Sequence, residues 1–356
     1  MRITVIGGGN IGTLMAAEIS RKGHQVTICT SKPLLWSSQI EVYDKDNNFL
    51  FRSGDIKITS SYKEGVSDAE IIFITLPAHL LHGVAEEILP YVSAGQKIGI
   101  IPGGGGAEFS FGNIIKRGAE LFCFQRVHCI ARLKEYGKSV LALGRKQNIE
   151  IASIPAKSAI KICKVISEFF DMPCVATSNY LCSTMTPSNN VLHTSRLYTM
   201  FLNYSAGIAY PQNYLFYEEW TDEASTVMLE LDRERKAVCN ALPADLSRVK
   251  GIDEHYESFT PEDMTKKIKS IPAFKGILTP MVKVEGGYIP DFTSRYFTSD
   301  FSYGLKIIKD LAKVFEVETP KIDEVLNWYI KVSGVKDGDM FNLGMNKEQI
   351  IAIYSE

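Results

Sequence analysis

Several features that mark other classes of protein are missing from this sequence of 356 residues. No apolar run reaches the roughly 20 residues that a membrane span requires, and the chain starts with a strand-like run that leaves no room for a signal peptide. The formal net charge is −2, so there is no strongly basic surface for nucleic acid or for an anionic membrane. We therefore expect a cytoplasmic protein that binds neither nucleic acid nor membranes.

The spacing of cysteine and histidine gives no sign of a disulfide framework or a metal site. The seven cysteines are odd in number and include no C-x-x-C pair, which argues for free thiols in a reducing compartment. His79 and His82 form an H-x-x-H pair but lack enough further ligands to hold a metal. No metal is therefore expected, and the apolar content of 45% is that of an ordinary globular protein.

The N-terminal segment contains the most informative pattern. An apolar run ends in Gly7-x-Gly9-x-x-Gly12, and a helix-like stretch follows. In a dinucleotide site the first glycine permits a tight turn, the second lets backbone N–H groups approach a pyrophosphate, and the third lets the helix pack on the strand. A plain glycine-rich turn is the alternative. The predicted cofactor contacts in this segment are Gly7, Gly9, Asn10, Ile11 and Gly12.

The end of the second predicted strand, residues 25–30, indicates which nucleotide is bound. A site for NAD usually has Asp or Glu about 20 residues after the glycines, but residues 19–40 contain no acidic side chain. Thr30, Ser31 and Lys32 instead offer hydroxyls and a cation, which suit a 2′-phosphate. We therefore expect NADP(H) to be favoured over NAD(H). The alternative is that these three residues form only a polar surface turn.

The first half of the chain alternates strand-like and helix-like segments, which predicts a parallel, doubly wound α/β sheet of the Rossmann type. Ligands in such sheets lie beyond the carboxyl ends of the strands. Two strand ends, residues 75–78 and 102–106, should therefore lie beside the nicotinamide half of the cofactor, with Leu76 and Pro77 as contacts. For the glycines at 103–106, a flexible surface loop is the alternative. Further strands of the sheet are predicted at residues 70–76, 97–101, 121–124, 139–143 and 149–153. For the later strands, an antiparallel direction is an alternative to a parallel one. Residues 156–170 are predicted to form a helix that covers the sheet.

After about residue 180 the pattern changes to helices. Apolar and aromatic residues recur at helical spacing over residues 190–209, 218–242, 302–315 and 322–332. The sequence therefore divides into a Rossmann domain at residues 1–180 and a helical, all-α domain at residues 181–356. The irregular residues 243–294 are the expected place of a substrate loop.

Two segments of the helical domain resemble the paired signatures of the octopine/nopaline (opine) dehydrogenase family. Residues 189–193 read Asn-Asn-Val-Leu-His, and residues 295–305 read Arg-Tyr-Phe-Thr-Ser-Asp-Phe-Ser-Tyr-Gly-Leu. Family members have Asn-x-x-x-His and Arg-Tyr-x-x-x-Asp-x-x-Tyr-Gly-Leu after an N-terminal Rossmann domain, so the resemblance covers nearly the whole chain. The chain departs from the family at Asn190, Thr194 and Ser299, which puts the substrate in question more than the chemistry.

The resemblance implies that an α-keto acid condenses with the amine of an amino acid and that the imine is then reduced with a nicotinamide cofactor. That reaction needs an acid/base group, which His193 supplies, and a planar cation for a carboxylate, which suits Arg295. Asp300 is expected to orient the ring of His193, and Asn189 completes the catalytic set. Each of these four residues also has a purely structural interpretation when it is considered alone. His193 would be a core histidine and Arg295 a surface residue. Asp300 and Asn189 would be helix caps.

We therefore predict an NADP(H)-dependent opine-type dehydrogenase whose small-molecule substrates bind between the domains. A homodimer is one option for its oligomeric state. One alternative is a β-hydroxyacid dehydrogenase similar to ketopantoate reductase, but such enzymes usually rely on a lysine, and none stands in a comparable place near His193. Another is a nucleotide-binding regulator without catalysis, which would tolerate the loss of His193, Arg295 and Asp300. The keto acid and the amino acid are not identified, because pocket shape sets that choice.

Overall fold

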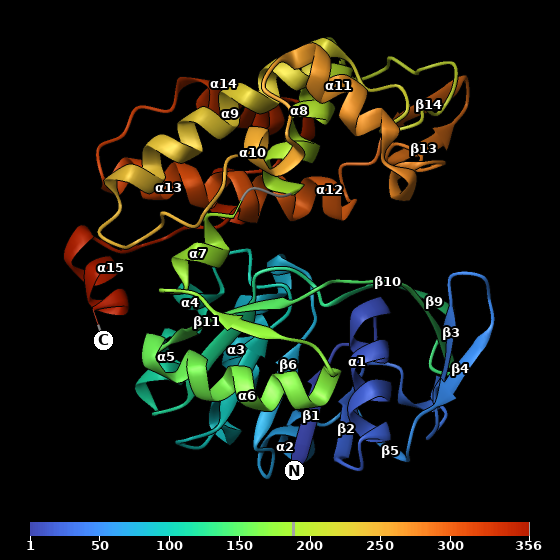
Figure 1. The fold of residues 1–356 in the computed structure, drawn as a ribbon. Coiled ribbons are helices and arrows are strands. Elements are labelled where there is room, and N and C mark those ends of the chain that lie inside the picture. The colour runs from blue at the N-terminus through green and yellow to red at the C-terminus, as the bar shows by residue number, and fades with distance from the viewer. Residues whose placement is uncertain (187–188, 356) are drawn as a thin grey trace. The chain divides into compact units, whose positions relative to one another are not determined.

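The computed structural model describes residues 1–186 and 189–355, and their contacts divide the chain into two units (Figure 1). The first unit is Met1–Thr184 together with Ile351–Glu356, and the second is Met185–Ile350. The division predicted from the sequence, between residues 180 and 181, instead placed the C-terminal residues in the second domain. The difference arises because the end of the chain packs on the first unit, where the Tyr354 hydroxyl donates to Glu108 at 3.0 Å. Helical periodicity cannot reveal a contact of this kind.

The first unit contains the predicted doubly wound sheet. Its eight strands follow the order β12-β11-β8-β7-β6-β1-β2-β5, and every neighbouring pair is parallel except β8 and β11. The Rossmann-type class predicted from the sequence is confirmed, and of the later strands, for which an antiparallel arrangement was one option, β11 runs antiparallel to β8. The strands are β1 (Arg2–Ile6), β2 (Gln25–Cys29), β5 (Ile56–Thr59), β6 (Ile71–Ile74), β7 (Lys97–Ile100), β8 (Glu120–Phe124), β11 (Ile149–Ile154) and β12 (Cys174–Ala176).

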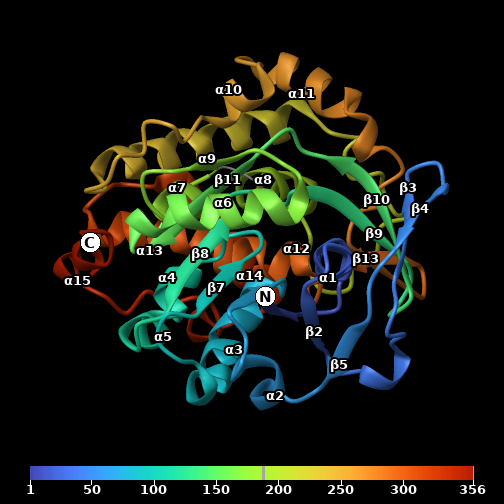
Figure 2. The ribbon, with the colours of Figure 1, turned by 60° about the horizontal axis from the view of Figure 1, so that its bottom comes forward.

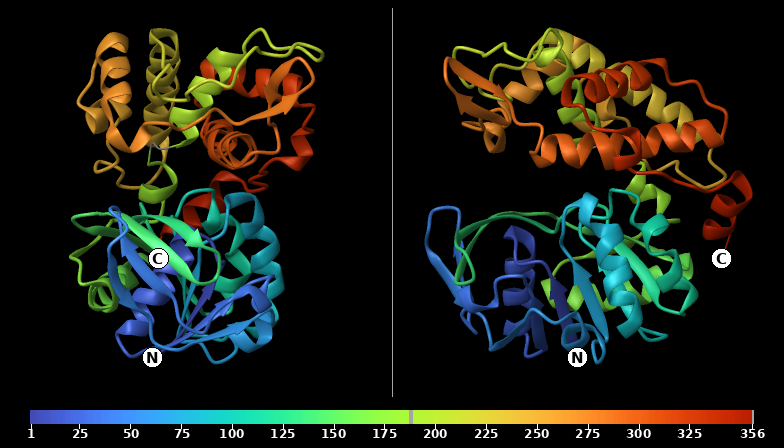
Figure 3. Two further views of the ribbon diagram at one scale, coloured as in Figure 1. Left: turned by 90° about the vertical axis from the view of Figure 1, so that its right-hand side faces the viewer. Right: turned by 180° about the vertical axis from the view of Figure 1, so that it is seen from behind.

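Helices cover both faces of this sheet, which is why its strands are continuous apolar runs. In β6, Ile71 and Phe73 face the core shared with α1 (Asn10–Arg21) and α6 (Ala159–Phe170), the two helices in front of the sheet in Figure 1. Ile72 and Ile74 face the opposite core, on the side seen from behind in Figure 3. The helices of that side are α2 (Tyr62–Val66), α3 (Leu81–Ile88), α4 (Ala107–Ser110) and α5 (Gly112–Lys116).

One predicted strand belongs to a different sheet. Residues 139–143 were expected to complete the doubly wound sheet, but they lie in β10 (Ser139–Arg145), which pairs with β9 (Cys129–Glu135) and β3 (Glu41–Asp44). Together with β4 (Phe49–Arg52) these strands form a separate four-stranded sheet (Figure 2). The predicted place of residues 139–143 was wrong, because an apolar run predicts a strand but not the strand that pairs with it. Here β10 pairs with β9, the preceding strand of a hairpin.

The second unit is mainly helical, as the pattern after residue 180 predicts. Local signals fix several helix ends: the Thr221 side chain accepts from the Ala224 N–H, Pro320 begins α14, and Gly334 ends it at a φ of 71°. The helices are α8 (Asn189–Phe201), α9 (Asp222–Ala241), α10 (Ile252–Tyr256), α11 (Pro261–Ser270), α12 (Arg295–Thr298), α13 (Lys306–Val314) and α14 (Pro320–Ser333).

The irregular part of the second unit includes a small hairpin of β13 (Met281–Val284) and β14 (Gly287–Pro290). A π-helical segment, η6 (Asp300–Leu305), joins α12 to α13 in one nearly continuous helical run (Figure 1). The remaining helices are α7 (Leu181–Thr184) in the first unit and α15 (Lys347–Tyr354) near the C-terminus. None of the helices in the described parts of the chain combines the length and the apolar composition that a membrane crossing requires.

Candidate active site

The loop between β1 and α1 has the geometry of an anion site. Gly7 has a φ of +111°, which favours glycine, and a Cβ at Gly12 would lie 2.0 Å from the Gly7 carbonyl oxygen. A Cβ at Gly9 would meet no atom within 4 Å, so the loop is open at the helix start. No side chain caps α1, and its first turn contains no acidic residue. The N–H groups at the start of α1 can therefore hold a pyrophosphate, and the residues fit the expected cofactor.

Neighbouring predicted contacts surround this loop. The Thr75 hydroxyl donates to the Gly7 carbonyl at 3.1 Å, and the Leu76 side chain lies beside the same glycine. Pro77 is exposed at the end of the same connection. Asn10 has a structural contact, because its side-chain oxygen accepts from the Leu133 N–H at 2.9 Å and so joins the start of α1 to β9.

The three residues after β2 differ in their surroundings. Thr30 is buried, and its hydroxyl lies 3.0 Å from that of Tyr136, at the turn between β9 and β10. Ser31 and Lys32 are exposed. Among the described residues, the Lys32 ammonium has no hydrogen-bond or ion-pair partner, so its charge is available to a ligand. Trp36 packs edge-on against Tyr136 with ring centroids 5.6 Å apart, and this pair borders the same strand end.

In the second unit, His193 lies in the middle of α8 and both of its ring nitrogens have partners. Nδ1 lies 2.7 Å from Asp300 Oδ2, and Nε2 lies 2.8 Å from the Tyr217 hydroxyl. Because a carboxylate can only accept, Nδ1 carries hydrogen, and in the neutral ring Nε2 accepts from Tyr217. The imidazole is only 3% exposed, and Tyr296 stacks on it with ring centroids 4.1 Å apart. This arrangement can hold or release one proton at Nε2.

The close approach of α8 to η6 brings Asp300 to His193. Asp300 is the first residue of η6, where the wider π-helical turn begins; such turns are frequent at functional sites. A Cβ at Gly304 would lie 2.6 Å from the Cβ of Asn190 on α8. Glycine at 304 therefore permits the two helical segments to pack at this distance, and the Tyr-Gly-Leu signature has a packing role.

The two other predicted catalytic residues lie at helix starts. Arg295 is the first residue of α12 and is exposed. Within residues 1–186 and 189–355, its guanidinium makes no hydrogen bond or ion pair, and it lies 5.9 Å from the centroid of the Tyr296 ring. Asn189 is the exposed first residue of α8. The structure thus brings His193 and Asp300 into contact and leaves Arg295 and Asn189 open.

Sequence reasoning missed the aromatic residues around His193. Tyr217 donates to it, and Phe216 meets it edge-on with ring centroids 5.4 Å apart. Burial raises the pKa of the Tyr217 hydroxyl above its usual range. Tyr296 was within reach, because it directly follows Arg295 in the second signature. Phe216 and Tyr217 precede α9 in a segment without periodicity, so no local signal indicates them.

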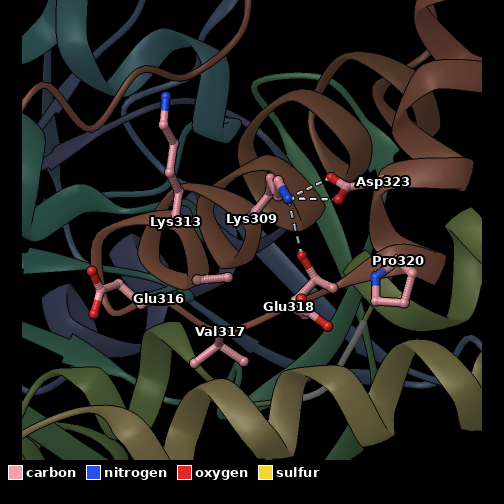
Figure 4. A pocket seen from close by; sticks show the side chains of 9 residues that line it. Lys309, Lys313, Glu316, Val317, Glu318, Pro320 and Asp323 are labelled. Atoms are coloured by element: carbon pink, nitrogen blue, oxygen red, sulfur yellow. Dashed lines mark hydrogen bonds and ion pairs between the residues drawn. The ribbon is translucent and has the colours of Figure 1, made fainter.

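A pocket of about 470 Å³ lies elsewhere in the second unit, between α13 and the start of α14 (Figure 4). Lys309 faces it but pairs with Asp323 at 2.6 Å, and Lys313 and Glu316 add opposite charges to its lining. This pocket is formed by helix ends other than those that hold His193 and Asp300. We therefore place the candidate site at the histidine.

Comparison with known proteins agrees with both halves of this description. The family model described as NAD-dependent glycerol-3-phosphate dehydrogenase N-terminus matches residues 2–104. The model described as NAD/NADP octopine/nopaline dehydrogenase, alpha-helical domain, matches residues 176–333, which include His193, Arg295 and Asp300. The fold and the matched segments define a nicotinamide-nucleotide-dependent dehydrogenase with a Rossmann-like domain followed by a helical domain.

Similar proteins extend over nearly the whole chain. Octopine dehydrogenase of Pecten maximus is 26% identical over 92% of this chain and 89% of its own length, and tauropine dehydrogenase of Arabella iricolor is 25% identical over 93% and 91%. A structure of octopine dehydrogenase in complex with NADH and agmatine has a TM-score of 0.84 at 23% identity, covering 100% of this chain and 98% of that chain. Yersinopine dehydrogenase with NADP⁺ bound has a TM-score of 0.68 at 13% identity, covering 99% and 97%. The helical-domain match, the relatives and the solved structures support the opine dehydrogenase family and an oxidoreductase acting on CH–NH bonds.

Proposed function

We propose that this protein is an NADP(H)-dependent opine dehydrogenase that condenses an α-keto acid with the amine of an amino acid and reduces the imine. The observation that carries the proposal is the part-buried contact between His193 Nδ1 and Asp300 Oδ2, which lie 2.7 Å apart although the residues are 107 positions apart in sequence. An ionised carboxylate at Nδ1 orients the ring and stabilises its protonated form, as in other sites that use a histidine for proton transfer.

His193 serves as the acid/base group in this proposal. The amino acid must lose a proton from its ammonium group before the nitrogen can attack the carbonyl carbon, and His193 takes up that proton. The carbonyl oxygen later leaves as water, which requires a proton in return. When bound, the reduced nicotinamide supplies the hydride that converts the imine into a secondary amine. The glycine loop of β1 and α1 would hold that nucleotide by its pyrophosphate.

Arg295 is the proposed carboxylate ligand. Its guanidinium offers two parallel N–H donors, and no partner among the described residues competes for them. Both proposed substrates carry a carboxylate, so a planar cation near the acid/base group suits either of them. Asn189, exposed at the start of the same helix as His193, is proposed as a further polar contact.

The cofactor preference rests on the residues after β2. Ser31 and Lys32 are exposed, and they stand where a site for NAD usually has an acidic residue. A hydroxyl and a cation at this place support a 2′-phosphate as ligand. Thr30 contributes less than the sequence indicates, because its hydroxyl is buried against Tyr136. We therefore propose Ser31 and Lys32 as the residues that select NADP(H) over NAD(H).

Oxidation of NADPH in the presence of paired substrates tests this function. The protein is incubated with NADPH, one α-keto acid and one amino acid, in a panel that varies both, and the product is identified by mass spectrometry. The proposal requires oxidation that depends on the amine and yields a secondary amine dicarboxylate. A hydroxy acid formed at the same rate with and without amino acid would contradict it.

A further inference from the structure

The turn between β9 and β10 reaches the end of β2, the place at which a site of this type distinguishes NADPH from NADH. Tyr136 lies at this turn, and its hydroxyl is 3.0 Å from that of Thr30, although the two residues are 106 positions apart in sequence. The backbone N–H of Lys32 donates to the same Thr30 oxygen at 3.3 Å. Thr30 is only 8% exposed, whereas Tyr136 is half-buried. Tyr136 therefore has the more accessible hydroxyl of the pair.

The two hydroxyls carry one hydrogen more than their mutual contact uses. Each group has one hydrogen, and a single hydrogen serves the bond between the two oxygens. The other hydrogen has no acceptor within residues 1–186 and 189–355. If Tyr136 donates to Thr30, that hydrogen is left on the buried Thr30 side chain, where an unmade hydrogen bond is costly. The favoured direction is from Thr30 to Tyr136, which leaves the Tyr136 hydroxyl as a donor for a ligand.

The position of Tyr136 is fixed by the segment that follows β2. Trp36 meets the Tyr136 ring edge-on, with centroids 5.6 Å apart, and the Ser37 N–H donates to the Gly137 carbonyl at 2.9 Å. Gly137 has a φ of +71°, and a Cβ there would lie 2.5 Å from the Leu35 carbonyl oxygen. The turn and the segment at 35–37 are thus packed closely together. The hydroxyl is held in place before a ligand binds, which reduces the entropy that binding must overcome.

The small four-stranded sheet that carries this turn is itself attached to α1. The Asn10 side-chain oxygen accepts from the Leu133 N–H at 2.9 Å, and His128 lies 2.7 Å from the buried Glu18 carboxylate. Both contacts join the chain at or just before β9 to the helix whose start is the proposed pyrophosphate site. The sheet therefore places its hairpin turn at a constant distance from that helix.

The charges around the turn favour a phosphate group. Glu135, the acidic neighbour of Tyr136, pairs with Lys138 at 2.6 Å. The Lys32 ammonium is unpaired among the described residues. A hydroxyl donor and a free cation at one strand end suit the 2′-phosphate of NADP(H), which accepts hydrogen bonds from both. The 2′-hydroxyl of NAD(H) would gain much less from the cation.

We propose that Tyr136 selects the nucleotide, because its hydroxyl donates to the 2′-phosphate while Thr30 orients it. The inference rests on the cofactor preference proposed above. It adds a residue that comes from the small sheet instead of the segment after β2, and it gives that sheet a part in nucleotide recognition.

The test measures the affinities of NADPH and NADH by calorimetric titration, without substrates, for the unmodified protein and for Tyr136→Phe. The substitution keeps the ring against Trp36 and removes only the hydroxyl. We expect the affinity for NADPH to fall roughly tenfold, since a hydrogen bond to a charged group is lost, and that for NADH to stay within about twofold. Tyr43→Phe is the matched control, because Tyr43 is a half-buried tyrosine of the same sheet whose hydroxyl donates to Glu41 at 2.6 Å. This control should keep both affinities within about twofold.

Two results would overturn the role of Tyr136. An NADPH affinity that is unchanged in Tyr136→Phe would show that the hydroxyl does not contact the 2′-phosphate. An equal loss of affinity for NADPH and NADH would show that the tyrosine only supports the packing of the turn. Adenosine 2′,5′-bisphosphate and 5′-AMP, titrated in the same way, restrict the comparison to the adenosine half, and the ratio of their affinities should fall by the same factor as that of NADPH to NADH.

This inference and the proposed cofactor preference fail in different ways. If the unmodified protein binds NADPH and NADH equally, the proposed preference is wrong. The change that Tyr136→Phe causes in the affinity ratio still tests the contact, because loss of a donor to the 2′-phosphate shifts the ratio toward NADH whatever its starting value. If the unmodified protein prefers NADPH and Tyr136→Phe keeps the full preference, only the role of Tyr136 is wrong.

Discussion

Glu108 offers a sharp test of how burial controls the stability of the first unit. The residue lies in the first turn of α4, the helix that follows the glycine-rich connection after β7, and it is fully buried. One carboxyl oxygen accepts hydrogen bonds from Thr184 and Tyr354, and the other has no hydrogen-bond partner among the described residues. Because a charge there would be poorly solvated, burial raises the pKa of Glu108 from the usual 4.5 to about 7.

The change of stability with pH that Glu108 causes has the opposite sign to that caused by most carboxylates, whose pKa is lowered in the folded protein. Between pH 4.5 and 7 the folded protein binds a proton that the unfolded chain has released, so stability decreases as the pH rises through this range. A pKa difference of this size corresponds to roughly 3 kcal/mol in the free energy of unfolding. For a unit of this size, that is about 6–12 °C in Tm. Below pH 4.5 and above pH 7 the contribution of Glu108 is constant.

The assay measures Tm between pH 4.5 and 8 for the unmodified protein and for Glu108→Gln, which resembles the protonated side chain. We expect the unmodified protein to lose about 6–12 °C relative to the variant across this range. Glu87→Gln, at an exposed position on α3, is the control and should follow the unmodified protein. Parallel pH profiles for the unmodified protein and Glu108→Gln would refute the reasoning, because the buried carboxyl would then have an ordinary pKa.

Three further predictions concern the candidate site. The unmodified protein should bind NADPH roughly tenfold or more tightly than NADH, since charge-assisted hydrogen bonds contribute about 1.5–3 kcal/mol, and Lys32→Asp should erase or reverse this preference in fluorescence titrations. Equal affinities in the unmodified protein would contradict it. His193→Ala should leave nucleotide binding nearly intact and lower turnover by roughly 100-fold or more; unchanged turnover would make His193 a core residue. Arg295→Lys keeps the charge but loses the planar fork, so the KM for the carboxylate substrates should rise about tenfold, and an unchanged KM would exclude a bidentate contact.

The parts of the fold that the sequence predicts well are those fixed by neighbouring residues. The run from β1 through Gly12 to α1 is specified by an apolar strand, three glycines and a helix, all within a few turns of chain. The helices of the second unit follow from apolar periodicity and from caps such as Thr221. By contrast, β10 joined an unexpected sheet, because its hairpin partner β9 and the parallel strand β3 are set by tertiary packing.

The candidate site shows the same limit. His193 and Asp300 were predicted from the family signatures, and their contact across 107 residues could not follow from local pattern. Tyr217 was missed, because it lies in an irregular segment and meets His193 through a tertiary contact across 24 residues. The sequence also does not reveal that the Thr30 hydroxyl lies 3.0 Å from that of Tyr136, so its part in cofactor binding stays a prediction.

The two family signatures act as one structural element. Glycine at 304 lets η6 approach α8 so closely that a Cβ there would meet Asn190 at 2.6 Å. That approach brings Asp300, at the start of the π-helical turn, to the imidazole of His193. The glycine therefore positions the proposed acid/base pair through helix packing. A residue that allows two helices to touch can in this way fix the orientation of a side chain that it does not itself carry.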